Sequence, residues 1–225
     1  MPTYEGLRLK ILKYDRKLFG NAHQKSLKHK KFTIISNNCW GGEVYEYYSL
    51  QKQSPTVGLF FMADDYIRFV SYLRDYLNAE LKFIKPEQSK WKEYWLHKDS
   101  RFGTYPIGQL QLGRETETVE IFFLHYHSEE EARSKWQRRC ERINWDKMIV
   151  KFNDQNGCTE EHIRKSVDLN FPHKAFFTCK SWPEIKGRKA SGLWYEEISQ
   201  FPQHEQIMAS FEPFNKKVTQ LINSL

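Results

Sequence analysis

Short apolar runs alternate with segments of helical periodicity along most of the chain. Runs of strand length, rich in β-branched and aromatic residues, occur at residues 32–36, 56–61, 81–84, 148–152 and 173–178. After the second run, apolar residues recur at helical spacing, at Ile67, Val70, Leu73 and Leu77. Apolar strands separated by helices predict an α/β fold. We expect a three-layer, Rossmann-like arrangement in which helices cover both faces of a mainly parallel sheet.

Two further apolar runs leave part of the topology open. "YPIGQLQL" (105–112) and "VEIFFLHY" (119–126) either pair as an antiparallel ribbon or both join the main sheet. Ser128 and Glu131 form a capping box, which predicts a helix that runs to about Asn144. Further helices are expected at residues 159–169 and 215–225.

The length and the cysteine spacing favour a single intracellular domain. A chain of 225 residues is long enough to bury about 70% of the surface that it exposes when unfolded. It contains neither an apolar run of membrane-spanning length nor a signal-peptide pattern, which predicts a cytoplasmic location. The spacing of the four cysteines predicts free thiols, with neither a zinc site nor a disulfide framework.

The positive charge of the chain is confined to its beginning. Residues 1–31 contain nine Lys or Arg against two acidic residues, which accounts for the whole formal charge of +7. The remaining domain, residues 32–225, is neutral, which disfavours nucleic acid as a partner. Leu7, Ile11, Tyr14 and Leu18 form an apolar stripe at helical spacing. The arm is therefore either a basic amphipathic helix that lies on an anionic membrane surface or a helix whose stripe packs on the domain.

The loop "SNNCWGG" after the first strand is a candidate binding site. In doubly wound sheets, ligands bind beyond the carboxyl ends of the strands, where the free amides of helix N-termini attract anions. Asn37 and Asn38 offer hydrogen bonds to sugar hydroxyls, Trp40 offers a stacking surface, and Gly41 and Gly42 permit close approach of a ligand. The alternative is that the glycines and asparagines form a tight turn and the tryptophan belongs to the core.

Four residues that follow predicted strands are candidates for catalysis. Cys39 at a helix start would have a lowered thiol pKa and would act as a nucleophile, although buried cysteines are usually inert. Asp64 and Asp65 would act as a base or bind a metal-bound donor, with one of them serving as a helix N-cap. His125 would act as acid or base. We expect these residues and Asn37 to meet in one cleft, without a dedicated metal site.

Arg138 and Arg139 are candidate ligands for a phosphate or carboxylate group. They lie in the later part of a predicted helix whose first turn is acidic. This order of charges also suits the helix dipole, so a solvated or ion-paired face is the alternative.

Several blocks of the chain together resemble one bacterial family. "FTIISNNCWGG", "GLFFMADDYIRFVSYL", "YPIGQL", "HYHSEEEARSKWQRRCERIN" and "NGCTEEHI" resemble, in this order, the domain of unknown function family 1919, whose members are often labelled exopolysaccharide biosynthesis proteins. The resemblance implies an α/β fold and a place in making capsule, exopolysaccharide or lipopolysaccharide chains, and some members carry an acetyltransferase label. It implies no established reaction and no catalytic residue.

The sequence thus leaves two functional hypotheses. The first is a transferase for acetyl or glycosyl groups that takes acetyl-CoA or a sugar nucleotide with Mg²⁺ as donor and acts on a polysaccharide precursor. The second is a non-catalytic carbohydrate-binding or assembly protein of the same pathway. Both place the protein in the cytoplasm, in contact with the inner face of the membrane if the arm binds lipid, and both leave the oligomeric state open.

Overall fold

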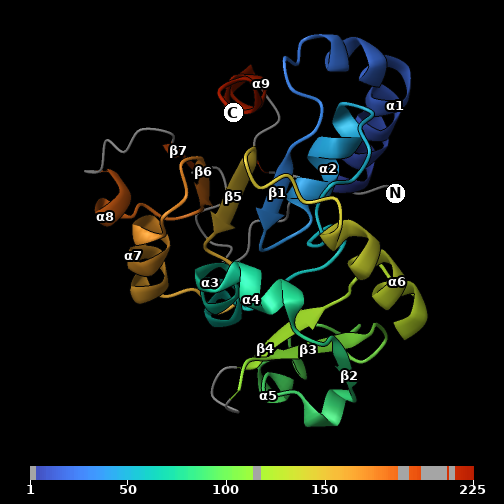
Figure 1. Ribbon diagram of the computed structural model, residues 1–225, viewed down its shortest axis with the longest axis vertical. Coiled ribbons are helices and arrows are strands. Elements are labelled where there is room, and N and C mark those ends of the chain that lie inside the picture. Colours follow the sequence, from blue (N-terminus) through green and yellow to red (C-terminus); the bar gives the residue numbers. More distant parts are fainter. Residues whose placement is uncertain (1–3, 114–117, 187–192, 199–211, 213–215) are drawn as a thin grey trace.

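The computed structural model describes residues 4–113, 118–186, 193–198, 212 and 216–225. Its main sheet has four parallel strands in the order β1-β5-β6-β7. In this sheet Thr33 lies opposite Met148, and Val150 lies opposite Lys174. The strands are β1 (Thr33–Ser36), β5 (Met148–Asn153), β6 (Lys174–Thr178) and β7 (Leu193–Glu197). The predicted α/β fold with a parallel sheet is therefore confirmed (Figure 1).

Successive residues of these strands enter two different cores. Ile34 and Phe177 pack in a core with α2 and α9, whereas Ile35 and Phe176 pack in a core with α3 and α7. This alternation follows from the two-residue period of a strand, and it explains why the strands are apolar on both faces. The helices concerned are α2 (Trp40–Tyr47), α9 (Lys216–Asn223), α3 (Ala63–Ser71) and α7 (Glu160–Asp168). The order of layers is thus helices, sheet, helices.

A second sheet is antiparallel and separate from the first. The order of its strands is β2-β3-β4, with Phe83 opposite Gly108 and Ile107 opposite Phe122. Its strands are β2 (Lys82–Ile84), β3 (Ile107–Gln111) and β4 (Thr118–Phe122). Leu110, Val119 and Ile121 face the same core as α3, so this sheet covers one side of the parallel layer. Of the two topologies left open by the sequence, the antiparallel ribbon is the observed one.

Further helices surround the two sheets. They are α4 (Leu73–Asn78), η1 (Pro86–Gln88), α5 (Lys92–Trp95), α6 (Glu129–Cys140) and α8 (Pro183–Lys186). Ser128 caps α6 as predicted, because its hydroxyl accepts a hydrogen bond from the Glu131 amide at 3.1 Å.

Four local predictions are wrong. The run at residues 56–61 is no strand, because only Phe60 bridges to Phe122 and residues 56–58 form a turn. The helix after Asp64 divides at Tyr72, and Met62 is its N-cap, so both aspartates lie inside the first turn. Helix α6 ends at Cys140 instead of continuing to Asn144.

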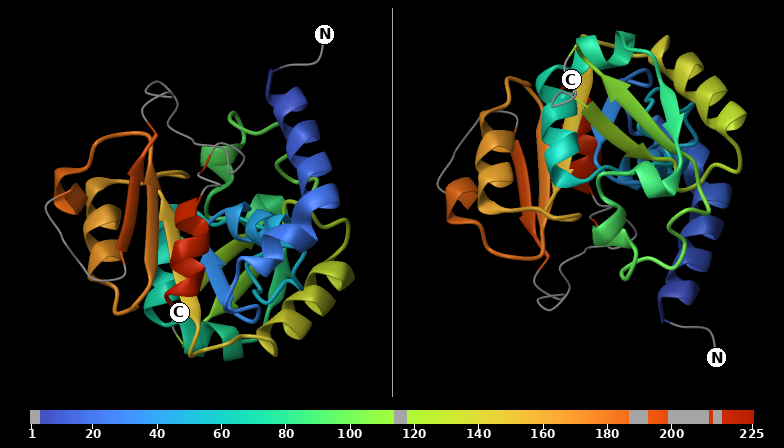
Figure 2. Two further views of the ribbon diagram at one scale, coloured as in Figure 1. Left: turned by 90° about the horizontal axis from the view of Figure 1, so that it is seen from above. Right: turned by 90° about the horizontal axis from the view of Figure 1, so that it is seen from below.

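Helix α1 (Tyr4–Lys25) lies along the outside of the molecule against α2 (Figures 1 and 2). Arg16 pairs with Glu43 at 2.9 Å, and the His23 ring stacks on Tyr47 with centroids 4.0 Å apart. The predicted apolar stripe does not pack on the domain at Ile11, Tyr14 and Leu18, whose side chains are exposed; the Leu7 side chain lies outside the described part. None of the described helices is long and apolar enough to cross a bilayer.

Candidate functional site

The carboxyl ends of β1 and β5 bring two polar loops together. These strands are parallel neighbours, with Ser36 opposite Lys151, so the residues that follow them meet at one edge of the sheet. Asn37 and Asn38 follow β1, while Asn153 ends β5 and Gln155 comes two residues later. All four amide side chains are buried. Because these polar groups are buried together, they need hydrogen-bond partners within the protein.

A fully buried ion pair lies at the centre of this polar cluster. The Lys151 Nζ lies 2.6 Å from the Glu212 Oε1, and both side chains have no exposed area. The same ammonium donates a hydrogen bond to the Asn38 Oδ1 at 2.9 Å. The chain brings Lys151 from within β5, whereas Glu212 comes from more than 170 residues beyond Asn38.

The amides connect the ion pair to both strand ends. The Glu212 Oε1 accepts hydrogen bonds from the Nδ2 atoms of Asn153 and Asn38, at 2.7 and 3.2 Å. Asn153 and Asn38 also donate to the Gln155 Oε1, and Asn37 donates to the Asn153 Oδ1 at 2.7 Å. The Glu212 Oε2 is buried and has no hydrogen-bond partner among the described residues. One carboxylate oxygen is therefore left as an acceptor for a hydroxyl or amide group.

The two charged groups have opposite pKa shifts with the same cause. Burial raises the pKa of Glu212, while Lys151 and the amide donors oppose this rise. Burial also lowers the pKa of Lys151, and the Glu212 carboxylate opposes this change. The two pKa values thus move towards each other, which brings the proton affinities of the carboxylate and the amine closer. Ionisable groups with perturbed pKa values occur often at functional sites, and they also occur in structural ion-pair networks.

Cys39 borders the cluster, but its thiol is not activated. The side chain is half-buried at the N-terminus of α2. Desolvation, followed by the Glu43 and Glu212 charges, raises the pKa of the Cys39 thiol to about 12. This shift is opposite to the lowered pKa on which the nucleophile hypothesis rests, because the thiolate is the reactive form.

The remaining residues of the predicted loop pack α2 on the sheet. Trp40 is fully buried and meets Phe177 edge-on, with ring centroids 5.2 Å apart. A Cβ atom added to Gly42 would lie 2.9 Å from the Val57 Cγ1, and one added to Gly41 would lie 3.1 Å from a methyl group of Ile34. The loop therefore divides into polar Asn37 and Asn38, which enter the cluster, and a packing part.

Asp64 and Asp65 belong to two other networks. Asp65 is fully buried, pairs with Lys90 at 2.5 Å and accepts a hydrogen bond from the Trp91 Nε1 at 2.5 Å. Burial raises the pKa of Asp65 to about 6, although Lys90 opposes the rise. Asp64 lies 3.7 Å from the His162 Nε2, and its interaction with His162 lowers the pKa of Asp64 to about 2. Neither carboxylate is hydrogen-bonded to the cluster around Lys151.

His125 also lies outside the cluster. Its amide donates to the Gly58 carbonyl at 3.1 Å, and its exposed side chain makes no hydrogen bond within the described part of the chain. Partial desolvation and the charges of Arg101 and Lys52 lower the pKa of His125. Hydrogen bonds thus place Asn37, Asp65 and His125 in separate environments, so they give no support to the single cleft expected from the sequence.

The two arginines of α6 differ in their surroundings. Arg138 is exposed to solvent. Arg139 is buried, and its Nη1 donates to the Val57 carbonyl at 2.9 Å and to the Tyr126 hydroxyl. Binding of a phosphate or carboxylate therefore stays a prediction for both, with Arg139 already engaged in a structural contact. Within the described residues, no group of three or more His, Cys, Asp or Glu side chains is placed to hold a metal ion.

Residues 91–105, which are rich in aromatic side chains, lie beside the loop that follows β5. A Cβ atom added to Gly157 would lie 3.9 Å from the Tyr94 ring, and Tyr94 meets Trp95 edge-on with centroids 4.9 Å apart. Trp95 is buried against Phe60, and its Nε1 has no hydrogen-bond partner in the described part of the chain. Arg101, from the same segment, contributes to the electrostatic field at Cys39. Aromatic rings thus lie close to the amide-rich edge.

Sequence reasoning missed Lys151, Asn153, Gln155 and Glu212. The polar run "NDQN" after β5 parallels "SNN" after β1, and Lys151 interrupts an otherwise apolar strand. Both are signals that the sequence contains. Glu212 has no comparable local signal, because its role depends on a long-range contact with Lys151.

Comparison with known proteins identifies a family. The model of the family described as Domain of unknown function (DUF1919) matches residues 10–220. A curated protein of Haemophilus influenzae (strain ATCC 51907 / DSM 11121 / KW20 / Rd), named "Uncharacterized protein", is 30% identical over 186 residues, which cover 83% of this chain and 80% of that protein.

Proposed function

We propose that this chain, which belongs to the DUF1919 family, is a transferase that acts on a sugar-containing precursor of a bacterial surface polysaccharide. The observation that carries this proposal is the buried Lys151–Glu212 pair within the polar cluster at the carboxyl edge of the parallel sheet. The place in polysaccharide synthesis rests on the resemblance of the sequence blocks to proteins with that label.

Burying the two charges of this cluster costs free energy that a purely structural role does not explain. Removing two charges from water costs several kcal/mol per ion, so a buried pair is weak evidence for a purely structural role. At the carboxyl edge of a parallel sheet, the same pair is placed where α/β proteins bind their ligands. A functional role for Lys151 and Glu212 therefore accounts for both their burial and their position.

The groups of the cluster match the chemistry of a sugar acceptor. The side-chain amides of Asn38 and Gln155 have donors and acceptors suited to hydroxyl groups, and their side chains retain slight exposure. The Glu212 Oε2 has no hydrogen-bond partner among the described residues, and it is the oxygen that would accept a hydroxyl proton. Lys151 provides a positive charge for the leaving group of a donor such as acetyl-CoA or a sugar nucleotide.

The proposed transfer forms one bond to the transferred carbon and breaks another. Glu212 takes the proton of the acceptor hydroxyl while the hydroxyl oxygen forms a bond to the transferred acyl or anomeric carbon. The bond from that carbon to the sulfur or phosphate oxygen of the donor breaks, and the leaving thiolate or nucleoside diphosphate keeps the electron pair. Lys151 stabilises the negative charge that develops on the leaving group.

A non-catalytic carbohydrate-binding protein is the second candidate. The observation in its favour is that Cys39 has a strongly raised pKa and that Asp65 and His125 make no hydrogen bonds to the polar cluster. On this alternative, the amides and the neighbouring aromatic rings hold a glycan, and the ion pair orients the amides.

A thermal-shift screen separates the two candidates. Acetyl-CoA, sugar nucleotides with and without Mg²⁺ or Mn²⁺, and short glycans are added at about a hundredfold excess over Kd. Binding then stabilises the fold by about 2.7 kcal/mol, and for a chain of this size each kcal/mol raises the Tm by about 2–4 °C. A response to a donor supports the transferase, whereas a response to glycans alone supports the binding protein.

Matched variants locate the responding site. Asn38→Ala removes one amide of the cluster, while Asn78→Ala removes an exposed amide at the end of α4. We expect the ligand-induced shift to disappear in Asn38→Ala and to persist in Asn78→Ala. An unchanged ligand response in Asn38→Ala would show that the ligand binds elsewhere.

A further inference from the structure

Helix α1 presents most of the exposed large hydrophobic side chains of the described structure. Seven such side chains occur in that part of the chain, and four of them belong to α1. They are Ile11 (59% exposed), Tyr14 (68%), Leu18 (69%) and Phe19 (52%). A concentration of apolar area on one helix is unusual for a soluble surface and marks an interaction site.

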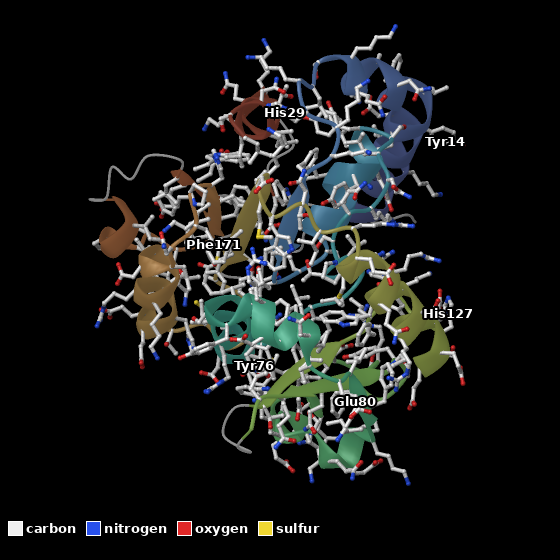
Figure 3. The ribbon with its side chains drawn as sticks, in the orientation of Figure 1. Tyr14, His29, Tyr76, Glu80, His127 and Phe171 are labelled. Atoms are coloured by element: carbon white, nitrogen blue, oxygen red, sulfur yellow. The ribbon has the colours of Figure 1, made fainter. Side chains whose placement is uncertain are left out.

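Three of these four side chains share one face of α1. Ile11, Tyr14 and Leu18 are separated by three and four residues, a spacing that aligns side chains along a helix. In Figure 3, Tyr14 lies at the outer margin of the molecule, away from both sheets. We call Ile11, Tyr14 and Leu18 the outer stripe.

The opposite side of α1 is held by the domain. Arg16 pairs with Glu43 at 2.9 Å and with Glu46 at 3.2 Å, and His23 stacks on Tyr47. These contacts fix the rotation of the helix, so the outer stripe faces away from α2. Figure 2 shows α1 along one side of the molecule, with its N-terminal end extending away from the sheets.

Charge selects the partner of the outer stripe. Residues 1–31 carry the whole formal charge of +7, whereas the rest of the chain is neutral. A second copy of the chain would bring a second cationic arm to the same contact and would be repelled. An anionic lipid surface attracts such an arm and accepts apolar side chains at the boundary between headgroups and acyl chains.

We propose that α1 docks the protein on an anionic membrane surface, with the outer stripe inserted at the headgroup–acyl boundary. The helix lies in the plane of the surface and does not cross the bilayer, in keeping with its polar composition. The Arg16 and His23 contacts join α1 to α2 and thereby fix the orientation of the domain relative to the membrane. This role is independent of the reaction proposed for the polar cluster.

Vesicle co-sedimentation of the full chain tests the stripe. The variant Ile11→Gln/Tyr14→Gln/Leu18→Gln removes its apolar area with a residue that favours helix formation. The control Tyr72→Gln/Leu96→Gln removes two exposed hydrophobic side chains outside α1. On phosphatidylglycerol-containing vesicles we expect the stripe variant to lose at least about tenfold in partition coefficient, because each of its residues loses buried apolar area. The control should stay within about twofold of the parent.

Salt and neutral lipid test the charge. Binding of the parent should fall steeply between about 0.1 and 1 M salt, where the Debye length decreases from about 10 to about 3 Å. It should also be weak on phosphatidylcholine vesicles. Equal sedimentation of the parent and the stripe variant on anionic vesicles would overturn the proposal, as would equal binding of the parent to both lipids.

Sedimentation velocity without lipid distinguishes the competing partner. We expect the parent and the stripe variant to have the same sedimentation coefficient and the same melting temperature. A parent dimer that the stripe variant dissociates would assign the outer stripe to a contact between two copies and would refute lipid docking.

Discussion

Replacing Lys151 by methionine should reveal how much the buried ion pair contributes to the fold. The change keeps much of the aliphatic volume but leaves the Glu212 carboxylate buried without its cation at 2.6 Å. Breaking a buried pair by removing one partner costs about 3–5 kcal/mol, because the remaining charge is uncompensated. With about 2–4 °C per kcal/mol for a chain of this size, we expect the Tm of Lys151→Met to fall by about 6–20 °C.

The double variant should recover part of this loss. In Lys151→Met/Glu212→Gln both charges are gone, while the Gln side chain still offers an oxygen to Asn38 and Asn153. Replacement of both members of a buried pair is often close to neutral. We therefore expect a coupling energy of about 1–3 kcal/mol from the double-mutant cycle, as found for residues within one network.

Urea unfolding at neutral pH measures these free energies. The control is Lys165→Met, because Lys165 pairs with Glu161 at a similar distance of 2.7 Å but with both side chains more than half exposed. Exposed pairs contribute only about 0–1 kcal/mol. The reasoning fails if Lys151→Met costs no more than Lys165→Met, or if the cycle gives no coupling between Lys151 and Glu212.

Three further predictions follow from other parts of the structure. Burial raises the pKa of Asp65 from 3.8 to about 6, so its contribution to stability is present below pH 3.8 and is lost as pH rises through 6. Urea titrations should show a loss of about 3 kcal/mol across this range that Asp65→Asn abolishes. Desolvation raises the pKa of the Cys39 thiol to about 12, so iodoacetamide at pH 8 should leave it unmodified in the native protein, and rapid native-state labelling would contradict the raised pKa. Gly42→Ala places a Cβ atom 2.9 Å from Val57 and should cost about 1–3 kcal/mol by overpacking; a neutral result in urea unfolding would show that α2 shifts freely.

The sequence predicts most of the fold because the strands of the main sheet carry a strong local signal. Ile34 and Ile35 are both apolar because they enter different cores, and this is the pattern of a strand buried on both faces. The run at residues 56–61 is similarly apolar but forms a turn at residues 56–58 and a single bridge at Phe60. An apolar run shows that a segment is buried, but it does not show whether a neighbouring strand is available to pair with it.

Two of the six residues of the polar cluster are predicted from the sequence. Asn37 and Asn38 are predictable because the residues after a strand of a parallel sheet are expected at its carboxyl edge. Asn153 and Gln155 occupy the equivalent position after β5, yet their sequence is equally typical of a turn. The pairing of Ser36 with Lys151 joins the two loops, and such long-range pairing cannot be read from one sequence.

Lys151, a charged residue inside β5, indicates a buried contact that the apolar pattern of the strand does not predict. A strand covered on both faces has no route for a lysine to reach water, so Lys151 requires a buried acceptor from another part of the chain. Any acid that satisfies Lys151 must also enter the sheet edge and must bring its own hydrogen bonds with it. Glu212 does so with donors from Asn38 and Asn153. A lysine within an apolar strand of an α/β chain therefore indicates buried acceptors nearby, but not their kind: for Lys151 they are Glu212 and Asn38, whereas Lys174 in β6 donates to the carbonyls of Val167 and Leu169.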